Sequence, residues 1–165
     1  MSEQRPWLAH YPAGVPAQID MDEFAAITDV FDAALLKYRD KPAFTNMGKT
    51  ISYGDLERLS RDFAAYLLGE LKLKKGDRVA IMMPNCLQYP IAVFGVLRAG
   101  LTVVNTNPMY TARELRHQLV DSGAVAMLVL FHGLEGSSAS HYAQAFAAEA
   151  QRRGWAIAVP HFRGC

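Results

Sequence analysis

The chain has 165 residues, of which 51% are hydrophobic and 20% are charged, and its formal net charge is +1. This length and composition suit a globular α/β protein, and the near-neutral charge gives no sign of a nucleic-acid partner. The two cysteines, Cys86 and Cys165, have no metal-ligand spacing and favour a reduced, cytoplasmic setting over a disulfide scaffold. No apolar run reaches about 18 residues, so we expect no transmembrane helix.

The first forty residues predict an arm followed by a helix. Residues 1–20 are rich in Pro, Gly and aromatic side chains and lack the apolar segment of a secretory signal, so we expect an extended arm. Residues 22–40 carry apolar side chains at spacings of three and four, which predicts an amphipathic helix. That apolar stripe comprises Phe24, Ile27, Phe31, Leu35 and Tyr38.

A hairpin and a second helix are expected next. Within residues 42–53, apolar Ala43 and Phe44 precede a turn at Met47-Gly48-Lys49, and Ile51 and Tyr53 follow it, which favours a β-hairpin. Ser52 and Asp55 have the spacing of a capping box, in which each side chain bonds the other residue's backbone N–H. The helix they open carries Leu56, Leu59, Phe63 and Leu67 on one face.

The rest of the chain alternates strands and helices. We expect strands at residues 78–83, 101–105, 124–131 and 155–160, and helices at 85–99, 111–122 and 140–153. Asn85 is the predicted cap of the first of these helices, Gly100 its end, and Thr111 with Glu114 a capping box for the second. The alternation predicts a parallel sheet with right-handed crossovers. The expected fold is therefore α/β: a partial parallel sheet with flanking helices, preceded by an N-terminal arm, a helix and a β-hairpin.

Residues 16–126 carry several motifs in a specific order. These motifs are GDRVAIMMPN, LRAG, VVNTNP and YTARELRHQL. With them this region closely resembles the amino-terminal part of bacterial long-chain fatty-acid–CoA ligases, which belong to the adenylate-forming, AMP-binding superfamily. The resemblance implies ATP-driven formation of an acyl-adenylate and then of a thioester with coenzyme A. It also implies magnesium, with a fatty acid and coenzyme A as the molecules bound by a full-length ligase.

The same region departs from that family in the residues that carry the chemistry. The family's Gly- and Thr-rich phosphate loop, its adenine-binding segment and its carboxy-terminal catalytic lysine have no counterpart here, so we expect this chain alone to bind no cofactor and hold no catalytic residue. We interpret Asn105, Asn107, Pro108 and Tyr110 as residues that shape a strand-to-helix turn. Two interpretations stay open for Lys72, Lys74 and Lys75. They form either a solvated turn or a patch for peripheral contact with the inner face of a membrane.

A second resemblance begins near residue 127. LVLFHGLEGSS, followed by FRGC about twenty residues later, resembles the early strand, turn and helix of α/β-hydrolases of a predicted esterase group. In that fold the turn supplies an oxyanion-hole N–H, and by motif match the amide of Leu134 is the vestigial candidate donor. The elbow serine, acid and histidine come later in such proteins.

Local residues offer no replacement for that missing triad. Gly136 to Ser140 reads G-x-S-x-S, which lacks the second glycine of a nucleophile elbow. His132 and His141 lie close together in sequence, but a base needs an oriented nucleophile and a zinc site needs three or four ligands. We therefore interpret these two histidines as structural and expect no metal site.

The sequence thus predicts two parts: residues 1–126, a fragment of an AMP-binding acyl-CoA ligase domain, and residues 127–165, an α/β-hydrolase-like fragment. Three hypotheses follow. The first is that the chain is a truncated fatty-acid–CoA ligase, inactive alone. The second is that it is an incomplete, esterase-like α/β-hydrolase with a foreign leader. The third is that it is a non-catalytic chimera, from gene fusion or a mis-joined gene, that at most pairs with a partner through its exposed sheet edge.

Overall fold

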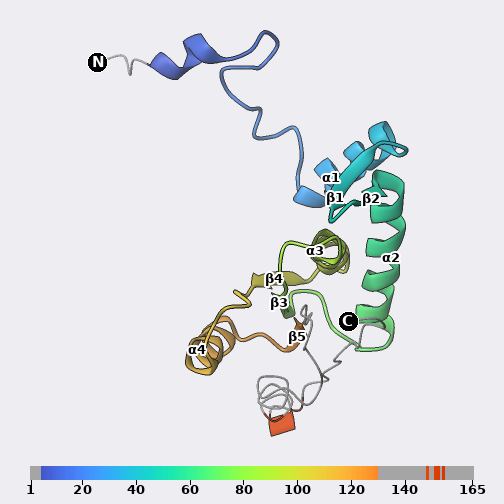
Figure 1. Ribbon diagram of the computed structural model, residues 1–165, viewed down its shortest axis with the longest axis vertical. Helices are drawn as coiled ribbons and strands as arrows, with labels where there is room; N and C mark the ends of the chain where they lie inside the picture. The colour runs from blue at the N-terminus through green and yellow to red at the C-terminus, as the bar shows by residue number, and fades with distance from the viewer. Residues whose placement is uncertain (1–4, 130–147, 149–150, 153, 155–165) are drawn as a thin grey trace.

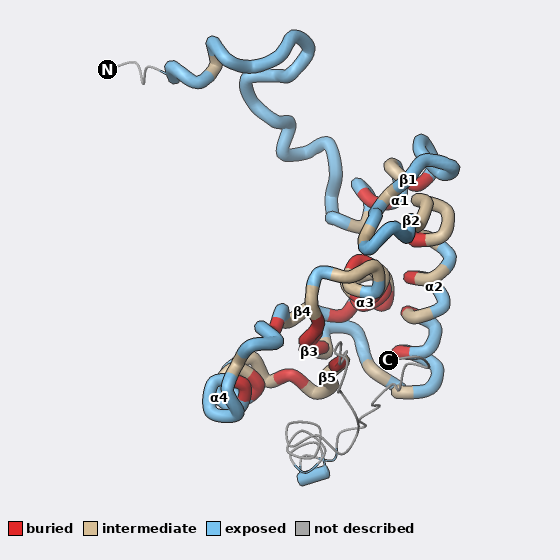
Figure 2. Tube along the Cα trace, in the orientation of Figure 1, coloured by how far each residue is buried: buried red, intermediate tan, exposed pale blue. Residues whose placement is uncertain are grey.

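The computed structural model describes residues 5–129, 148, 151, 152 and 154 of the chain. It begins with a short 3-10 helix, η1 (Pro6–His10), and an irregular segment that reaches residue 26. Almost every residue of this arm is exposed, and Figure 2 shows it in pale blue, running away from the body of the molecule. The predicted extended arm is confirmed.

The first helix, α1 (Ile27–Tyr38), starts five residues later than the sequence pattern predicted. The carboxylate of Asp29 accepts the backbone N–H of Ala26 at 3.1 Å, and this bond fixes the helix start. The predicted apolar stripe is correspondingly too long. Of its five members only Phe31 and Leu35 are buried. Tyr38, at the carboxyl end of the stripe, is 40% exposed although its ring centroid lies 5.9 Å from that of Tyr53.

The β-hairpin is confirmed. Strands β1 (Pro42–Asn46) and β2 (Lys49–Ser52) pair in antiparallel fashion. Met47 and Gly48 join them with positive φ angles of 46° and 74°. A two-residue turn with both φ angles positive matches the right-handed twist of a hairpin.

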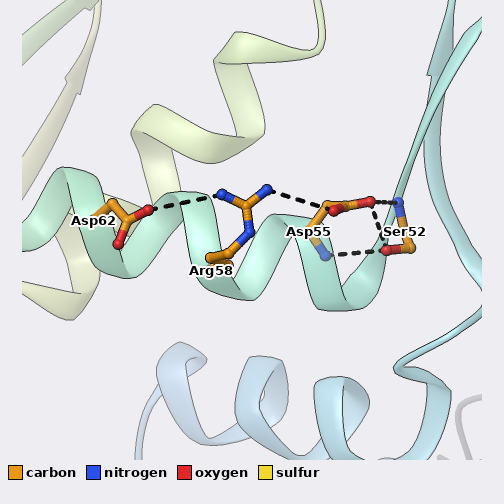
Figure 3. Close-up of polar contacts among 4 residues, drawn as sticks. All are labelled: Ser52, Asp55, Arg58 and Asp62. Carbon is orange, nitrogen blue, oxygen red and sulfur yellow. Dashed lines mark hydrogen bonds and ion pairs between the residues drawn. The ribbon is translucent and has the colours of Figure 1, made fainter.

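Helix α2 (Tyr53–Gly69) opens with the predicted capping box. The Ser52 Oγ accepts the backbone N–H of Asp55 at 3.0 Å, and the Asp55 carboxylate accepts the backbone N–H of Ser52 at 3.2 Å. Figure 3 shows this box and the side chain of Arg58, which reaches Asp55 on one side and Asp62 on the other. These exposed ion pairs add little to stability compared with the cap itself.

A parallel sheet of three strands forms the centre of the described body. Its strands are β3 (Arg78–Met82), β4 (Thr102–Asn105) and β5 (Ala126–Val129), in the order β4-β3-β5. Helix α3 (Gln88–Arg98) connects β3 to β4, and helix α4 (Ala112–Ser122) connects β4 to β5 (Figure 1). The predicted α/β fold with a partial parallel sheet is confirmed.

The side chains of β3 alternate between two apolar cores. Val79 and Ile81 pack with α2 and α3 on one face of the sheet. Ala80 and Met82 pack with α4 on the other face. The sheet is therefore covered on both sides, which is why β3 reads in the sequence as an unbroken apolar run rather than as an alternating one.

The predicted start of α3 needs a correction. The helix begins at Gln88, without a side-chain cap, and Asn85 lies three residues before it. Pro90 explains the delay, because a proline is tolerated only in the first turn, where its missing N–H would have no partner. The expectation that this helix packs on several sides is confirmed, since Gln88 is its one exposed residue.

The chain beyond β4 is described in part. Helix α4 starts at the predicted Thr111 box and ends at Gly123, whose φ angle is 61°. Strand β5 covers four of the eight residues predicted to be extended. The predicted helix at 140–153 lies largely outside the described residues, although 148, 151 and 152 are helical, and the predicted strand at 155–160 lies wholly outside them.

Close contact between α2 and α3 depends on Gly95. A Cβ atom placed there would lie 2.7 Å from Phe63 Cδ1 and 3.0 Å from the backbone oxygen of Ser60. The backbone of α2 cannot move aside as a flexible side chain could.

We therefore expect Gly95→Ala to destabilise the protein by roughly 1–3 kcal/mol, the usual cost of overpacking. Gly69→Ala is the matched control, because its added Cβ has nothing within 4 Å. Urea unfolding followed by circular dichroism measures both, and equal midpoints for Gly95→Ala and the unsubstituted chain would contradict this account of the α2–α3 contact.

Candidate functional site

The carboxyl ends of β3 and β4 form the place where an open α/β sheet ordinarily binds its ligand. The connection after β3 runs to α3 on one face, and the connection after β4 runs to α4 on the opposite face (Figure 1). Open α/β sheets bind their ligands beyond the carboxyl ends of their strands. The carboxyl ends of β3 and β4, with the turns that follow them, are our candidate site.

Asn105, at the end of β4, is the centre of a polar cluster at this edge. Its Oδ1 accepts the hydroxyl hydrogen of Tyr89 from α3 at 2.8 Å. Its backbone oxygen accepts an amide hydrogen from Gln118 of α4, also at 2.8 Å. One residue of the central sheet thus ties together the helices of both faces. The Oε1 of Gln118 is buried and has no partner among the described residues.

The turn that follows β4 is held by its own backbone and side chains. Buried Thr106 donates its N–H to the carbonyl of Ile81 at 2.9 Å. The Oδ1 of Asn107 accepts the N–H of Met109 at 2.9 Å. These bonds agree with the interpretation of this stretch as a strand-to-helix turn, for which Asn side chains are well suited.

Two concave surfaces flank the candidate site. One is a hollow of about 840 Å³ along α4, lined largely by polar and charged side chains such as Arg113, Glu114 and His117. The other is a groove of about 420 Å³ between β1 and the amino-terminal half of α3, and its lining is mainly apolar. Neither matches the convergent cations and N–H groups that a triphosphate requires.

Electrostatics at the hollow centre on the Thr111–Glu114 capping box. The Thr111 hydroxyl donates to the Glu114 carboxylate at 2.7 Å, and the Thr111 backbone N–H donates to it at 2.8 Å. These two hydrogen bonds, the side-chain bond first, lower the pKa of Glu114 from its ordinary value of 4.5. The box therefore holds Glu114 ionised at the helix start, where a negative charge is favourable.

The residues that sequence reasoning singled out are spread over the chain. Leu134, His132 and His141 lie outside the described residues, so the oxyanion-hole prediction stays a prediction. The exposed Lys72, Lys74 and Lys75 lie in the turn between α2 and β3. Across the described ranges, no three His, Cys, Asp or Glu side chains are grouped to hold a metal ion, and no helix is long and apolar enough to cross a membrane.

Sequence reasoning missed Tyr89 and Gln118, two members of the polar cluster. Tyr89 belongs to no quoted motif, and Gln118 lies in YTARELRHQL without being singled out there. A Tyr on one helix and a Gln on another become partners only when a strand end lies between them. The available signal was topological. Both occur on helices that flank neighbouring parallel strands, and both contact the residue that ends the second strand.

The fold defines a doubly wound α/β protein, and comparison with known proteins gives its family. The sequence profile of AMP-binding enzymes matches residues 31–160, and the chain belongs to this family. The solved N-terminal subdomain of Klebsiella oxytoca NpsA is similar in fold, with a TM-score of 0.61 at 24% identity over 68% of this chain and 30% of that one. The predicted AMP-binding resemblance is confirmed.

Individual relatives are similar over the same region. The chain is 59% identical over 127 residues to the long-chain-fatty-acid–CoA ligase of Yersinia pestis, which covers 77% of this chain and 23% of that protein. It is 57% identical over 124 residues to the Salmonella typhimurium protein of the same name, covering 75% and 22%. The chain therefore spans less than a quarter of the length of these relatives.

The comparisons give no support to the predicted hydrolase segment. The family match does not stop at residue 126 but continues to residue 160, across the predicted junction. The apolar strand at the junction suits either family, so the sequence pattern there could not locate a boundary.

We expect Thr111→Ala to lower the melting temperature by several degrees at pH 7, because the start of α4 loses its cap. Since the folded-state pKa of Glu114 is lowered, its contribution is present above pH 4.5 and is lost as the pH falls through the folded-state value. The difference between variant and unsubstituted chain should therefore shrink below about pH 4.5. Thr111→Ser, which keeps the hydroxyl, is the control. A difference that grows on acidification would contradict this role of the box.

Proposed function

We propose that this chain forms the amino-terminal part of the AMP-binding domain of a long-chain fatty-acid–CoA ligase, which activates fatty acids with ATP and joins them to coenzyme A. The observation that carries the proposal is 55–59% identity to proteins of that name in several bacteria over about three quarters of this chain. The order of the motifs between residues 76 and 119 agrees with it. We place the ligase-like part at residues 1–126.

The described residues provide a scaffold for this activity rather than its reacting groups. ATP with magnesium needs cationic side chains, convergent N–H groups and oxygen ligands. The cluster of Tyr89, Asn105 and Gln118 is neutral, and its buried atom without a partner among the described residues, the Oε1 of Gln118, is an acceptor, so the cluster does not fit a triphosphate. We infer that this part positions the sheet edge, and that ATP, magnesium and coenzyme A are bound by other parts of a ligase.

The 165-residue polypeptide should therefore form no acyl-CoA by itself. Stabilising the transferring phosphoryl group normally supplies several kcal/mol of barrier lowering, and no group in this sequence replaces it. The measurement is ATP-dependent formation of palmitoyl-CoA or oleoyl-CoA by the purified chain. A rate above that of a heat-treated sample would overturn the division of roles proposed here.

A second candidate function rests on one observation, the HGLEGSS motif at residues 132–138. As a hydrolase-like fragment spanning 127–165, this part would contribute the Leu134 amide to an oxyanion hole. An oxyanion donor accelerates acyl transfer only when a nucleophile is held against the substrate. The sequence contains no G-x-S-x-G elbow, so ester hydrolysis is not expected from this polypeptide.

For p-nitrophenyl esters we accordingly expect turnover no faster than that caused by free imidazole, and no change on His132→Ala. Ser138→Ala is the informative companion variant, because Ser138 occupies the serine position of the incomplete elbow. A saturable rate that Ser138→Ala abolishes would establish a nucleophile in this segment and favour the hydrolase hypothesis.

A further inference from the structure

The outer edge of β4 is a side of the central sheet that no described strand covers. In the order β4-β3-β5, and within the described residues, β4 pairs only with β3, in an unbroken register (Figure 1). Residues 101–105 contain no proline and no charged side chain, which are usual devices that keep an edge strand from pairing with another chain. This edge therefore offers its backbone to a further strand.

The hydrogen bonds between β4 and β3 show which backbone groups of β4 face outward. Thr102 and Thr106 donate their N–H groups to carbonyl oxygens in or next to β3, at 2.8 and 2.9 Å. Along a strand the N–H and C=O groups of alternate residues point to the same side. The even-numbered residues here thus turn toward β3, and Leu101, Val103 and Asn105 turn their backbone groups outward.

The first and the last of these outward groups already have partners inside the chain. The N–H of Leu101 donates to the carbonyl oxygen of Val96 at 3.1 Å, and the backbone oxygen of Asn105 accepts from Gln118 at 2.8 Å. The groups between them have no partner among the described residues. These are the carbonyl of Leu101, the N–H and carbonyl of Val103, and the N–H of Asn105.

This set of free groups is complementary to itself. When two such edges run antiparallel with Val103 opposite Val103, each Val103 donates to and accepts from the other. The N–H of each Asn105 then faces the carbonyl of the other Leu101. The groups that would face each other next, the Leu101 N–H and the Asn105 carbonyl, are the ones already bonded internally. Every outward group is then bonded, either within its own chain or across the pair.

We propose that β4 pairs in antiparallel fashion with β4 of a second copy of this chain, about a two-fold axis at Val103. The partner is another copy because the same groups donate and accept on both sides, as an isologous interface requires. Such a pair closes on itself and extends the sheet across both molecules. It uses none of the groups that a ligase reaction would need, so it stands or falls independently of the proposed function.

Sedimentation equilibrium of the purified chain tests the pairing, and the expected result is a monomer–dimer equilibrium. Val103→Pro should raise the dimer dissociation constant by about tenfold or more, because proline lacks the central N–H. Proline is tolerated at an edge position whose N–H faces outward, so the bonds to β3 remain. Val103→Ala is the matched control. It also shortens the side chain but keeps the N–H, and it should still form the dimer.

Hydrogen exchange of the unsubstituted chain tests the same register without any variant. The outward amides of Val103 and Asn105 should exchange about tenfold or more slowly at a protein concentration that favours the dimer than at one that favours the monomer, because their protection follows mass action. The amide of Val104 points toward β3 and should be protected in both samples.

Several results would overturn the inference. One is a chain that unfolds cooperatively and stays monomeric at every concentration. Another is a dimer that Val103→Pro and Val103→Ala weaken equally, and a third is association that continues beyond two copies, since a two-fold pair is closed. Protection of Val103 and Asn105 that does not change with concentration also contradicts it, because the edge is then covered within a single molecule.

Discussion

Burial of β3 on both faces and both edges is the constraint on which the rest of the structure depends. Val79, Ala80 and Ile81 are each at most 1% exposed. Each fully buried Val or Ile side chain contributes about 1.5–3 kcal/mol. Because successive side chains of β3 point to opposite faces, this burial requires a helix layer on each side and a paired strand at each edge. One face is covered by α2 and α3, and the other by α4. The two edges are paired with β4 and β5.

The same constraint places the candidate site. With β3 in the middle of the order β4-β3-β5, right-handed connections put α3 and α4 on opposite faces, and Asn105 at the end of β4 bonds to both helices. Its hydrogen bonds to both helices tie the two helix layers together at this edge.

Features that depend on neighbouring residues were predictable from the sequence, and features that depend on distant ones were not. The Ser52 and Thr111 boxes and the Met47–Gly48 turn involve residues at most three apart, so their patterns were sufficient. The start of α1 is an exception: it was misplaced although Ala26 and Asp29 are only three residues apart, because Ala26 has no capping side chain to mark the position. Tyr89 and Gln118 became partners of Asn105 only through the order of the strands, which no local pattern encodes.

Hydrogen exchange of the backbone amides tests the central role of β3 most directly. If the two-sided burial of β3 holds the fold together, the amides of Val79 to Met82 can exchange only when the whole body unfolds. Their exchange free energies should then equal the global free energy of unfolding measured with denaturant, while amides of the β1–β2 hairpin exchange by smaller openings. Exchange of the β3 amides as fast as, or faster than, that of the hairpin would contradict the account.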